Sequence, residues 1–555
     1  MKNNYAPQEP AAPIGFGSAP PQPEPWANPH AGYAPQSHLG FPPQPQSGYQ
    51  QTRFAPQQGY PQPGYPQHGY PPQYYGEPPG YGSSPPPPPP HPHQPQPQVV
   101  VVTNTGWYSR NQRNKPQSNA VGGAGLIFVS GGMNIAWSIG FHGRLYFKAS
   151  QHNFLAWFIG GIIGAFVSCL LTNKVPKKFI LIFSSILVMI GGIILASTRH
   201  NGSATLASSY LDGIGNGLIF APFLALAGEV SVPYMRGLIS ASIEQMCLGL
   251  GIFLQIIYTS AWSDSKYSSF NSENLKGVLS IIYGLLALII GSLLCIESPV
   301  IMLADNNEQG ALDALRRLQR PYTLTNETFE QLAEHKRYLA QNKDMSVGQS
   351  VCQAIPSFIR VVFLRVLNVL SISGFVVSSF SFFFVNEYGF GDYYGWYCGF
   401  AVSRWMGNFI ATFCMESAGR KKPTLLGLLV CGVLAFVMAA QYNIFTYNTG
   451  NAIMLLVFQF FAGVAFTATS PYLSEAYPLG VKQHFIAFTF MVEMLVFIVI
   501  GVCDWSRHGG AIYFYALGGL YIFGFVLSIF VLPETRRMTL REAQDKFNGF
   551  ISQGF

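Results

Sequence analysis

The chain has 555 residues, of which 49% are hydrophobic and only 10% are charged. A soluble domain carries about 25% charged residues, so this composition is too poor in charge for an ordinary soluble surface. The formal net charge is +7, but the basic residues stand singly between apolar runs. That distribution is typical of membrane topology and excludes a nucleic-acid-binding protein. Seven of the eight cysteines lie in apolar runs without metal-ligand spacing, so we predict no metal site and no cofactor.

Residues 1–105 differ in composition from the rest and hold most of the 40 prolines, together with Gln, Gly and Tyr. Such a segment cannot bury enough apolar surface to offset the entropy of ordering it, so we predict disorder. It contains two Pro-Pro-x-Tyr motifs, the ligand pattern of WW domains, followed by a run of six prolines. The motif residues are Pro71, Pro72, Tyr74, Pro78, Pro79 and Tyr81. A WW-domain or other proline-binding cytoplasmic protein is a predicted partner, with chance occurrence as the alternative.

Twelve stretches beyond the tail have the length and apolarity of membrane-spanning helices, which need about 20 residues. They lie at 121–141, 152–172, 178–198, 204–228, 238–260, 277–296, 361–386, 394–415, 424–442, 451–473, 485–504 and 511–532. We therefore predict an all-α membrane protein of twelve helices in a lipid bilayer.

The basic residues between these stretches predict the orientation. With both termini on the cytoplasmic side, the inner segments hold twenty-two Lys and Arg residues and the outer segments hold six. This asymmetry follows the positive-inside rule, so we predict a multi-pass plasma-membrane protein with cytoplasmic termini.

The longest connection, 297–360, divides the helices into two sets of six. Its leucines and arginines around 312–320 predict short amphipathic helices at the membrane surface. The predicted organisation is a tail at 1–105, a first half at 115–296, the connection at 297–360, a second half at 361–532 and a C-terminal tail at 533–555. Two six-helix halves around a central site are the architecture of transporters that work by rocking.

Charged residues recur at matching helix ends in the two halves. Glu229 and Arg236 follow the fourth stretch, and Glu475 and Lys482 follow the tenth, with the same seven-residue separation. Basic and acidic residues also end the second and eighth stretches. The recurring set is Lys177, Lys178, Glu229, Arg236, Glu416, Arg420, Glu475 and Lys482. We predict that this set is a cytoplasmic gate of ion pairs, with ordinary topogenic charge as the alternative.

These blocks resemble the sugar porter branch of the major facilitator superfamily, which includes the animal facilitative hexose transporters. Glu-Ser-Pro at 297–299 and Pro-Glu-Thr at 533–535 are similar to further blocks of that family, and the resemblance covers 115–547. It implies alternating access, with the gate closing the inside when the site faces out. Lys177 and Lys178 stand where the family has arginines, which pair better with carboxylates.

The resemblance is weaker at the central site. The run 368–375 keeps serines but has no amide side chain near its middle, where the family has a Gln-Gln pair and an Asn, and 466–471 lack the family's Gly-Pro-x-Pro-Trp pattern. Gln245 matches a family sugar contact, whereas Arg404 and Glu493 stand where the family has asparagines. We predict substrate binding by Gln245, Arg404 and Glu493. We also predict a mid-membrane ion pair between Arg404 and Glu493, with no other basic residue at that depth.

These features indicate transport of a small-molecule solute by alternating access. The solute is predicted to be small and polar, and a sugar is the first choice. The altered central site leaves two alternatives. One is a carrier of a charged or zwitterionic organic solute, and the other is a non-transporting sensor or scaffold that signals through the tail. No nucleotide-binding loop or catalytic motif is found in the sequence, so no enzyme activity is predicted.

Overall fold

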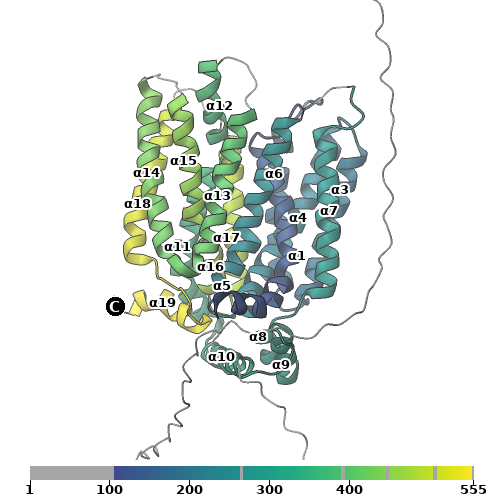
Figure 1. The fold of residues 1–555 in the computed structure, drawn as a ribbon, viewed down its shortest axis with the longest axis vertical. Helices are drawn as coiled ribbons and strands as arrows, with labels where there is room; N and C mark the ends of the chain where they lie inside the picture. The colour runs from purple at the N-terminus through teal and green to yellow at the C-terminus, as the bar shows by residue number, and fades with distance from the viewer. Residues whose placement is uncertain (1–105, 263–266, 389–393, 445–448, 504–508, 553–555) are drawn as a thin grey trace, which may run out of the picture. The chain divides into compact units, whose positions relative to one another are not determined.

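The computed structural model describes residues 106–262, 267–388, 394–444, 449–503 and 509–552, and all regular structure in these ranges is helical (Figure 1). The predicted tail at 1–105, with both Pro-Pro-x-Tyr motifs, lies outside the described residues.

The first half consists of six membrane-length segments, one of which contains a π-helical turn. The helices are α1 (Trp107–Ile139), α2 (Gln151–Leu171), α3 (Lys177–Ser197), α4 (Gly202–Val230), α5 (Arg236–Ala241), the π-helix η1 (Ser242–Met246), α6 (Cys247–Ala261) and α7 (Ser272–Leu294). The run α5–η1–α6 forms one continuous span. A π-helical turn inside an α-helix frequently marks a functional site, and this one carries Glu244 and Gln245.

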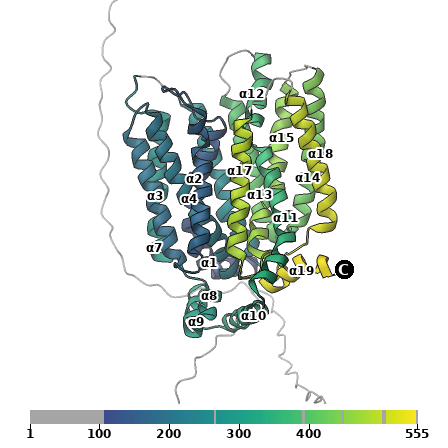
Figure 2. The same cartoon turned by 180° about the vertical axis from the view of Figure 1, so that it is seen from behind.

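Three short helices and a C-terminal helix gather at one end of the bundle, which we call the linker end (Figures 1 and 2). They are α8 (Pro299–Ala304), α9 (Glu308–Arg317), α10 (Asn326–Lys343) and α19 (Leu540–Ser552). The short helices predicted within 297–360 are therefore present.

The second half repeats the arrangement. Its helices are α11 (Val347–Ser371), α12 (Gly374–Tyr388), α13 (Tyr394–Ala418), α14 (Lys421–Ile444), α15 (Thr449–Phe466), α16 (Thr469–Glu475), α17 (Lys482–Val502) and α18 (Gly509–Val531). Two of its spans are interrupted, α11–α12 near Ile372 and α15–α16 near Thr467. Interrupted helices expose backbone groups near the middle of a transporter, where substrate sites form.

Eleven segments of the described chain are long and apolar enough to cross a membrane. The remaining predicted span is α13, a 25-residue helix that packs between α6 and α15 with Arg404 and Asn408 on its buried face. The predicted all-α architecture is confirmed. Two boundaries differ most, because α1 begins at Trp107 and not at 121, and α11 begins at Val347 inside the predicted connection and not at 361.

Glycines let the helices approach closely at equivalent crossings in the two halves. A Cβ atom on Gly217 of α4 would lie 2.1 Å from the carbonyl oxygen of Gly161 in α2. In the second half, a Cβ atom on Gly407 of α13 would lie 2.2 Å from the carbonyl oxygen of Phe460 in α15. Small residues at such crossings are typical of membrane helices, whose association depends on close packing.

Candidate functional site: a charged gate and a central cluster

The first part of the predicted gate is centred on Glu229, at the linker end of α4. Lys177 Nζ of α3 lies 2.9 Å from Glu229 Oε2, and Lys482 Nζ of α17 lies 3.6 Å from Glu229 Oε1. All three side chains are buried. Because α17 belongs to the second half, Glu229 joins the two halves.

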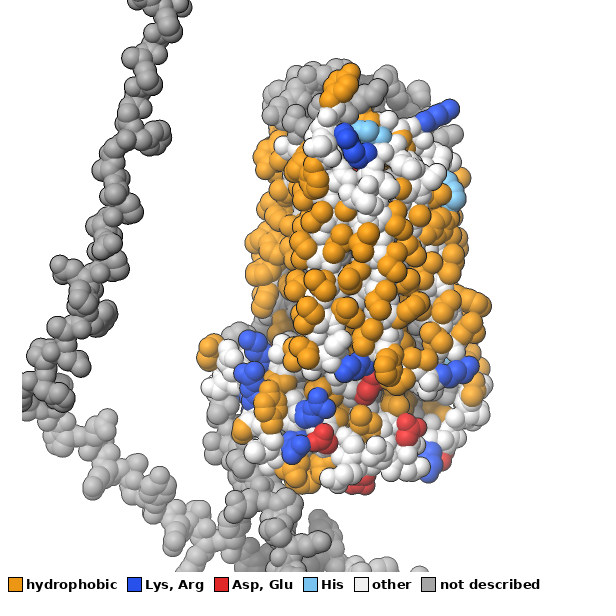
Figure 3. Space-filling view, turned by 90° about the vertical axis from the view of Figure 1, so that its right-hand side faces the viewer, with side chains coloured by type: hydrophobic (Ala, Val, Ile, Leu, Met, Phe, Trp, Pro, Cys, Tyr) orange, Lys and Arg blue, Asp and Glu red, His pale blue; other side chains and the backbone are white. Residues whose placement is uncertain are grey.

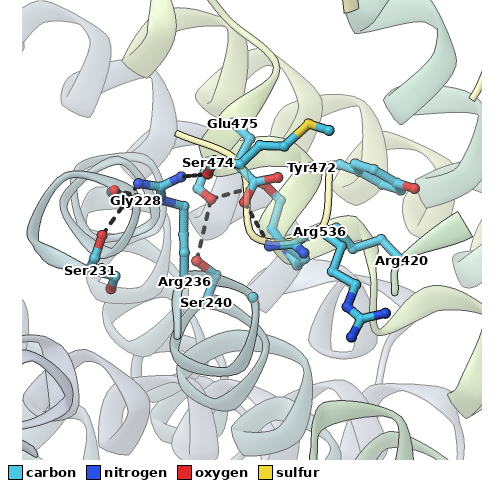
Figure 4. A network of polar contacts seen from close by, with 12 residues as sticks. Gly228, Ser231, Arg236, Ser240, Arg420, Tyr472, Ser474, Glu475 and Arg536 are labelled. Carbon is cyan, nitrogen blue, oxygen red and sulfur yellow. Dashed lines mark hydrogen bonds and ion pairs between the residues drawn. The ribbon is translucent and has the colours of Figure 1, made fainter. Parts of the chain in front are cut away.

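The second part is centred on Arg420, between α13 and α14. Its Nη2 lies 2.9 Å from Glu475 Oε1 and 3.7 Å from Glu416 Oε1 (Figure 4). The nearby acids raise the pKa of Arg420 above its usual value although burial opposes this. Glu416 Oε1 also accepts a hydrogen bond of 2.9 Å from the backbone N–H of Gly237 in the first half. This part therefore also crosses between the halves.

Arg236 lies beside these ion pairs but bonds to backbone. Its guanidinium donates to the carbonyl oxygens of Gly228 at 3.0 Å, Ser231 at 3.3 Å and Met538 at 2.7 Å. The side chain of Lys178 has no acidic partner within 4 Å among the described residues. The predicted set thus divides into six residues that form ion pairs and two that do not.

The family-like blocks at 297–299 and 533–535 have equivalent roles that the sequence did not reveal. Glu297 accepts a 2.8 Å hydrogen bond from the backbone N–H of Lys178, at the start of α3. Glu534 accepts hydrogen bonds of 3.0 to 3.1 Å from the backbone N–H groups of Arg420 and Lys421, at the start of α14. A carboxylate is stabilised at a helix N-terminus by the free N–H groups and the helix dipole. Each half therefore uses one acid to fix the helix that carries its gate base.

A second charged cluster lies inside the bundle and is centred on Arg365 of α11. Arg365 Nη1 and Nη2 lie 2.8 and 2.9 Å from Glu244 Oε1 of η1, and Nη2 lies 3.0 Å from Glu493 Oε2 of α17. Glu244 also accepts from Gln245 Nε2 at 2.8 Å and from the hydroxyl of Ser470. The cluster residues are almost completely buried, and one acid comes from each half.

The predicted ion pair between Arg404 and Glu493 is wrong, because Glu493 pairs with Arg365. Arg404 donates to Ser371 Oγ at 2.9 Å, to Gln459 Oε1 at 3.4 Å and to the Asn368 side chain. No acid lies within 4 Å of Arg404 in the described part of the chain.

The expectation that no other basic residue reaches this depth is also wrong. With a span starting at 361, Arg365 would lie near the membrane border. The helix begins at Val347 instead, which leaves Arg365 well inside α11.

The three residues predicted to bind substrate lie close together. Gln245 and Glu493 belong to the Arg365 cluster, and Arg404 donates a hydrogen bond to Asn368, which lies three residues after Arg365 on α11. The backbone oxygen of Gln245 accepts from Asn408 of α13 at 3.2 Å. Substrate binding by these residues stays a prediction.

A cavity of about 520 Å³ opens at the end of the bundle opposite the linker end. It is lined by residues of both halves: Ser138, Ile139, Gly140, His142, Gln151, Phe154, Leu155, Phe158, Ser373, Gly374, Phe375, Ser378, Ser379, Phe382, Tyr442, Phe497, Ile500, Gly501, Cys503 and Gly510. The lining is largely aromatic and apolar, with hydroxyl, amide and imidazole groups among it. Phe497 lies one helical turn beyond Glu493 on α17, so the cavity ends just above the charged cluster.

The fold and the two charged clusters define a membrane carrier of the major facilitator class. The family described as "Sugar (and other) transporter" matches residues 102–547, and the chain belongs to this family.

The chain is 24% identical over 410 residues to the hexose transporter HXT13 of Saccharomyces cerevisiae, covering 70% of this chain and 71% of that protein. It is 23% identical over 431 residues to the facilitated glucose transporter member 3 of Mus musculus, covering 71% and 81%. The structure of the proton:xylose symporter XylE bound to 6-bromo-6-deoxy-D-glucose matches with a TM-score of 0.67 at 15% identity, over 78% of this chain and 99% of that chain.

Proposed function

We propose that this protein carries a sugar across a membrane by alternating access. The family, the hexose and glucose transporters among its relatives, and a cavity between two halves all support this. The observation that carries the proposal is the asymmetry of the two ends. The ion pair between Glu229 and Lys482 and the hydrogen bond from Gly237 to Glu416 join the halves at the linker end, while a cavity is open at the other end.

The predicted orientation in the membrane indicates which side the open cavity faces. If the linker end with its many Lys and Arg residues faces the cytoplasm, the structure is an outward-facing state. Transport to the inside then requires the contacts of Glu229 with Lys482 and of Glu416 with Gly237 to break, because both join the halves. Both termini would lie in the cytoplasm, and the plasma membrane is the membrane in which we place the protein.

The buried side chains beyond the cavity include groups suited to a polyhydroxyl compound. Glu493 lies one helical turn from Phe497, which lines the cavity. Glu493, Asn368, Gln245 and Arg404 are all buried and do not line it themselves. Together these side chains can donate to and accept from neutral hydroxyl groups. We propose that the sugar contacts Glu493 first, and that Gln245 responds through the contacts of Glu493 and Glu244 with Arg365.

The test is uptake into liposomes by the purified full-length protein, measured with labelled hexoses, pentoses, polyols and charged metabolites. Saturable uptake of a sugar, competed by other sugars, is expected. Binding of sugar without uptake would identify a sensor instead. Uptake of only charged solutes would contradict the sugar assignment.

The tail and the transport machinery have separate roles in this proposal. We propose that the Pro-Pro-x-Tyr motifs bind a WW-domain protein that controls how much transporter is present at the cell surface. This rests on the sequence motifs alone.

A further inference from the structure

A second cavity, of about 350 Å³, lies away from the transport path at the linker end. It is formed where the start of α1, the end of α7 and the end of α9 meet. Its lining residues are Pro116, Asn119, Leu293, Leu294, Ile296, Arg317 and Tyr322. Neither the gate nor the central cluster contributes to it, so the proposed function does not explain it.

The lining holds one charged residue, Arg317, and no acid. No acidic side chain lies within 4 Å of Arg317 in the described ranges. The preceding residue, Arg316, is equally part of α9 but forms an ion pair with Asp313. Arg317 is therefore a cation directed to a cavity that offers it no protein counter-ion.

The other side of the cavity continues into an apolar stripe along α7. Ile282, Leu285, Ile289 and Leu293 follow one another at three- and four-residue spacing, with exposed fractions of 43%, 44%, 45% and 71%. This spacing places them on one face of the helix. In a bilayer such a face is covered by acyl chains, so the stripe leads from the lipid core to Arg317.

Figure 3 views the molecule from this side, on which α3 and α7 lie. Hydrophobic side chains form a continuous band over the spans, and Lys and Arg side chains, with Asp and Glu among them, gather below that band, toward the linker end. The change from apolar to charged surface marks the level at which lipid headgroups begin. The end of α7 and the end of α9 lie near this level.

We propose that this cavity binds an anionic phospholipid. The headgroup phosphate contacts the Arg317 guanidinium, and the acyl chains lie along the α7 stripe that ends at Leu293. Arginine suits this role because its planar fork of N–H donors matches phosphate oxygens. Tyr322, half-exposed at the cavity, has the amphipathic ring that is favoured at headgroup depth. A bound lipid would connect α9 of the linker to α1 and α7 of the first half.

The experiment uses the full-length protein in neutral detergent micelles, titrated with dioleoyl phosphatidylglycerol, dioleoyl phosphatidylcholine or inorganic phosphate, with bound lipid counted by native mass spectrometry. The parent and Arg316→Gln are expected to bind phosphatidylglycerol equally. Arg317→Gln should bind it about fivefold more weakly, because one basic residue near a headgroup contributes about that factor. Phosphatidylcholine binding should be weaker and the same in all three proteins.

Three results would overturn the proposal. Equal phosphatidylglycerol binding by Arg317→Gln and the parent would show that Arg317 is not the contact. Equal loss in Arg316→Gln and Arg317→Gln would indicate a general effect of surface charge. Competition of inorganic phosphate with lipid at similar concentrations would assign the site to a free anion. Arg317 is exposed, so its replacement should leave folding intact, which gel filtration verifies.

Discussion

Arg365 of α11 and Glu244 of η1 form a buried ion pair of 2.8 Å that joins the two halves inside the bundle. It lies between the cavity at one end and the ion pairs at the other. A movement of one half against the other must therefore change this contact as well as the gate. Glu493, the second acid on Arg365, lies on α17 next to the cavity.

Replacing Arg365 by Ala should destabilise the protein strongly. The change leaves Glu244 and Glu493 buried without their cation, and breaking a buried pair in this way costs about 3–5 kcal/mol. We expect a large loss of folded protein on thermal challenge, measured by fluorescence-detected gel filtration. Glu493→Gln in the same background should restore part of the loss.

Double variants also test which arginine, Arg365 or Arg404, pairs with Glu493. Because Arg404 does not pair with Glu493, the double variant Arg404→Ala, Glu493→Ala should recover less stability, relative to its single variants, than Arg365→Ala, Glu493→Gln does. A full recovery of stability in that double variant would contradict the pairing in the structure.

Glu475→Gln should weaken the closed linker end, because it removes a partner of Arg420 at 2.9 Å. Arg420 also pairs with Glu416, which accepts the hydrogen bond from Gly237 of the other half. We expect a shift toward the state that is open at the linker end and slower transport, with normal membrane insertion. Cysteine labelling from each side of the membrane reports the shift. Lys336→Ala is the control, because its ion pair with Glu308 is exposed and should contribute little. Equal labelling in Glu475→Gln and the parent would contradict a gating role and would indicate that Glu475 is ordinary topogenic charge.

Gly217→Ala should destabilise the first half by about 1–3 kcal/mol, the usual cost of overpacking. The new methyl group would clash with the backbone oxygen of Gly161 and force α2 and α4 apart. Gly519→Ala is the matched control, because nothing lies within 4 Å of a Cβ atom there. The two variants are compared by their thermal unfolding midpoints in the same detergent. Equal midpoints would contradict the close crossing of α2 and α4.

The contact of α10 with the bundle should weaken in acid. Burial, followed by nearby Arg236, lowers the pKa of His335 on α10 to about 4, from a usual value of 6.5. The folded state therefore binds the proton less well than the unfolded state. The resulting stability is complete above about pH 6.5 and is lost as the pH falls toward 4.

Hydrogen exchange of α10 at pH 7.5 and pH 4.5 measures this effect. We expect the parent to lose protection at the lower pH and His335→Gln to lose less. Carboxylates of the protein titrate in the same pH range and also affect exchange. The effect of His335 is therefore the difference in pH response between the parent and His335→Gln. An identical pH response in both would contradict the assignment to His335.

The sequence predicts the ion-paired residues at the linker end better than those at the centre, for a physical reason. Glu229, Glu475 and their bases lie just after apolar runs, so their depth follows directly from where each run ends. At the centre, contacts depend on which helix faces meet. The π-helical turn at 242–246 alters the direction of Glu244, and no residue pattern predicts such a turn. The early start of α11 likewise concealed Arg365, because polar residues at 347–360 obscured the helix.

The most direct test of alternating access joins the two halves at the closed end. Ser240 and Ser474 lie on opposite halves, with their hydroxyl oxygens 3.3 Å apart (Figure 4). Cysteines at both positions should form a disulfide, which needs Cβ atoms about 3.5–4.5 Å apart. The measurement is sugar uptake into liposomes by Ser240→Cys, Ser474→Cys protein, oxidised and then reduced, beside the two single variants. The account predicts that oxidation abolishes uptake only in the double variant and that reduction restores it. Parental uptake by the oxidised, cross-linked protein would contradict it.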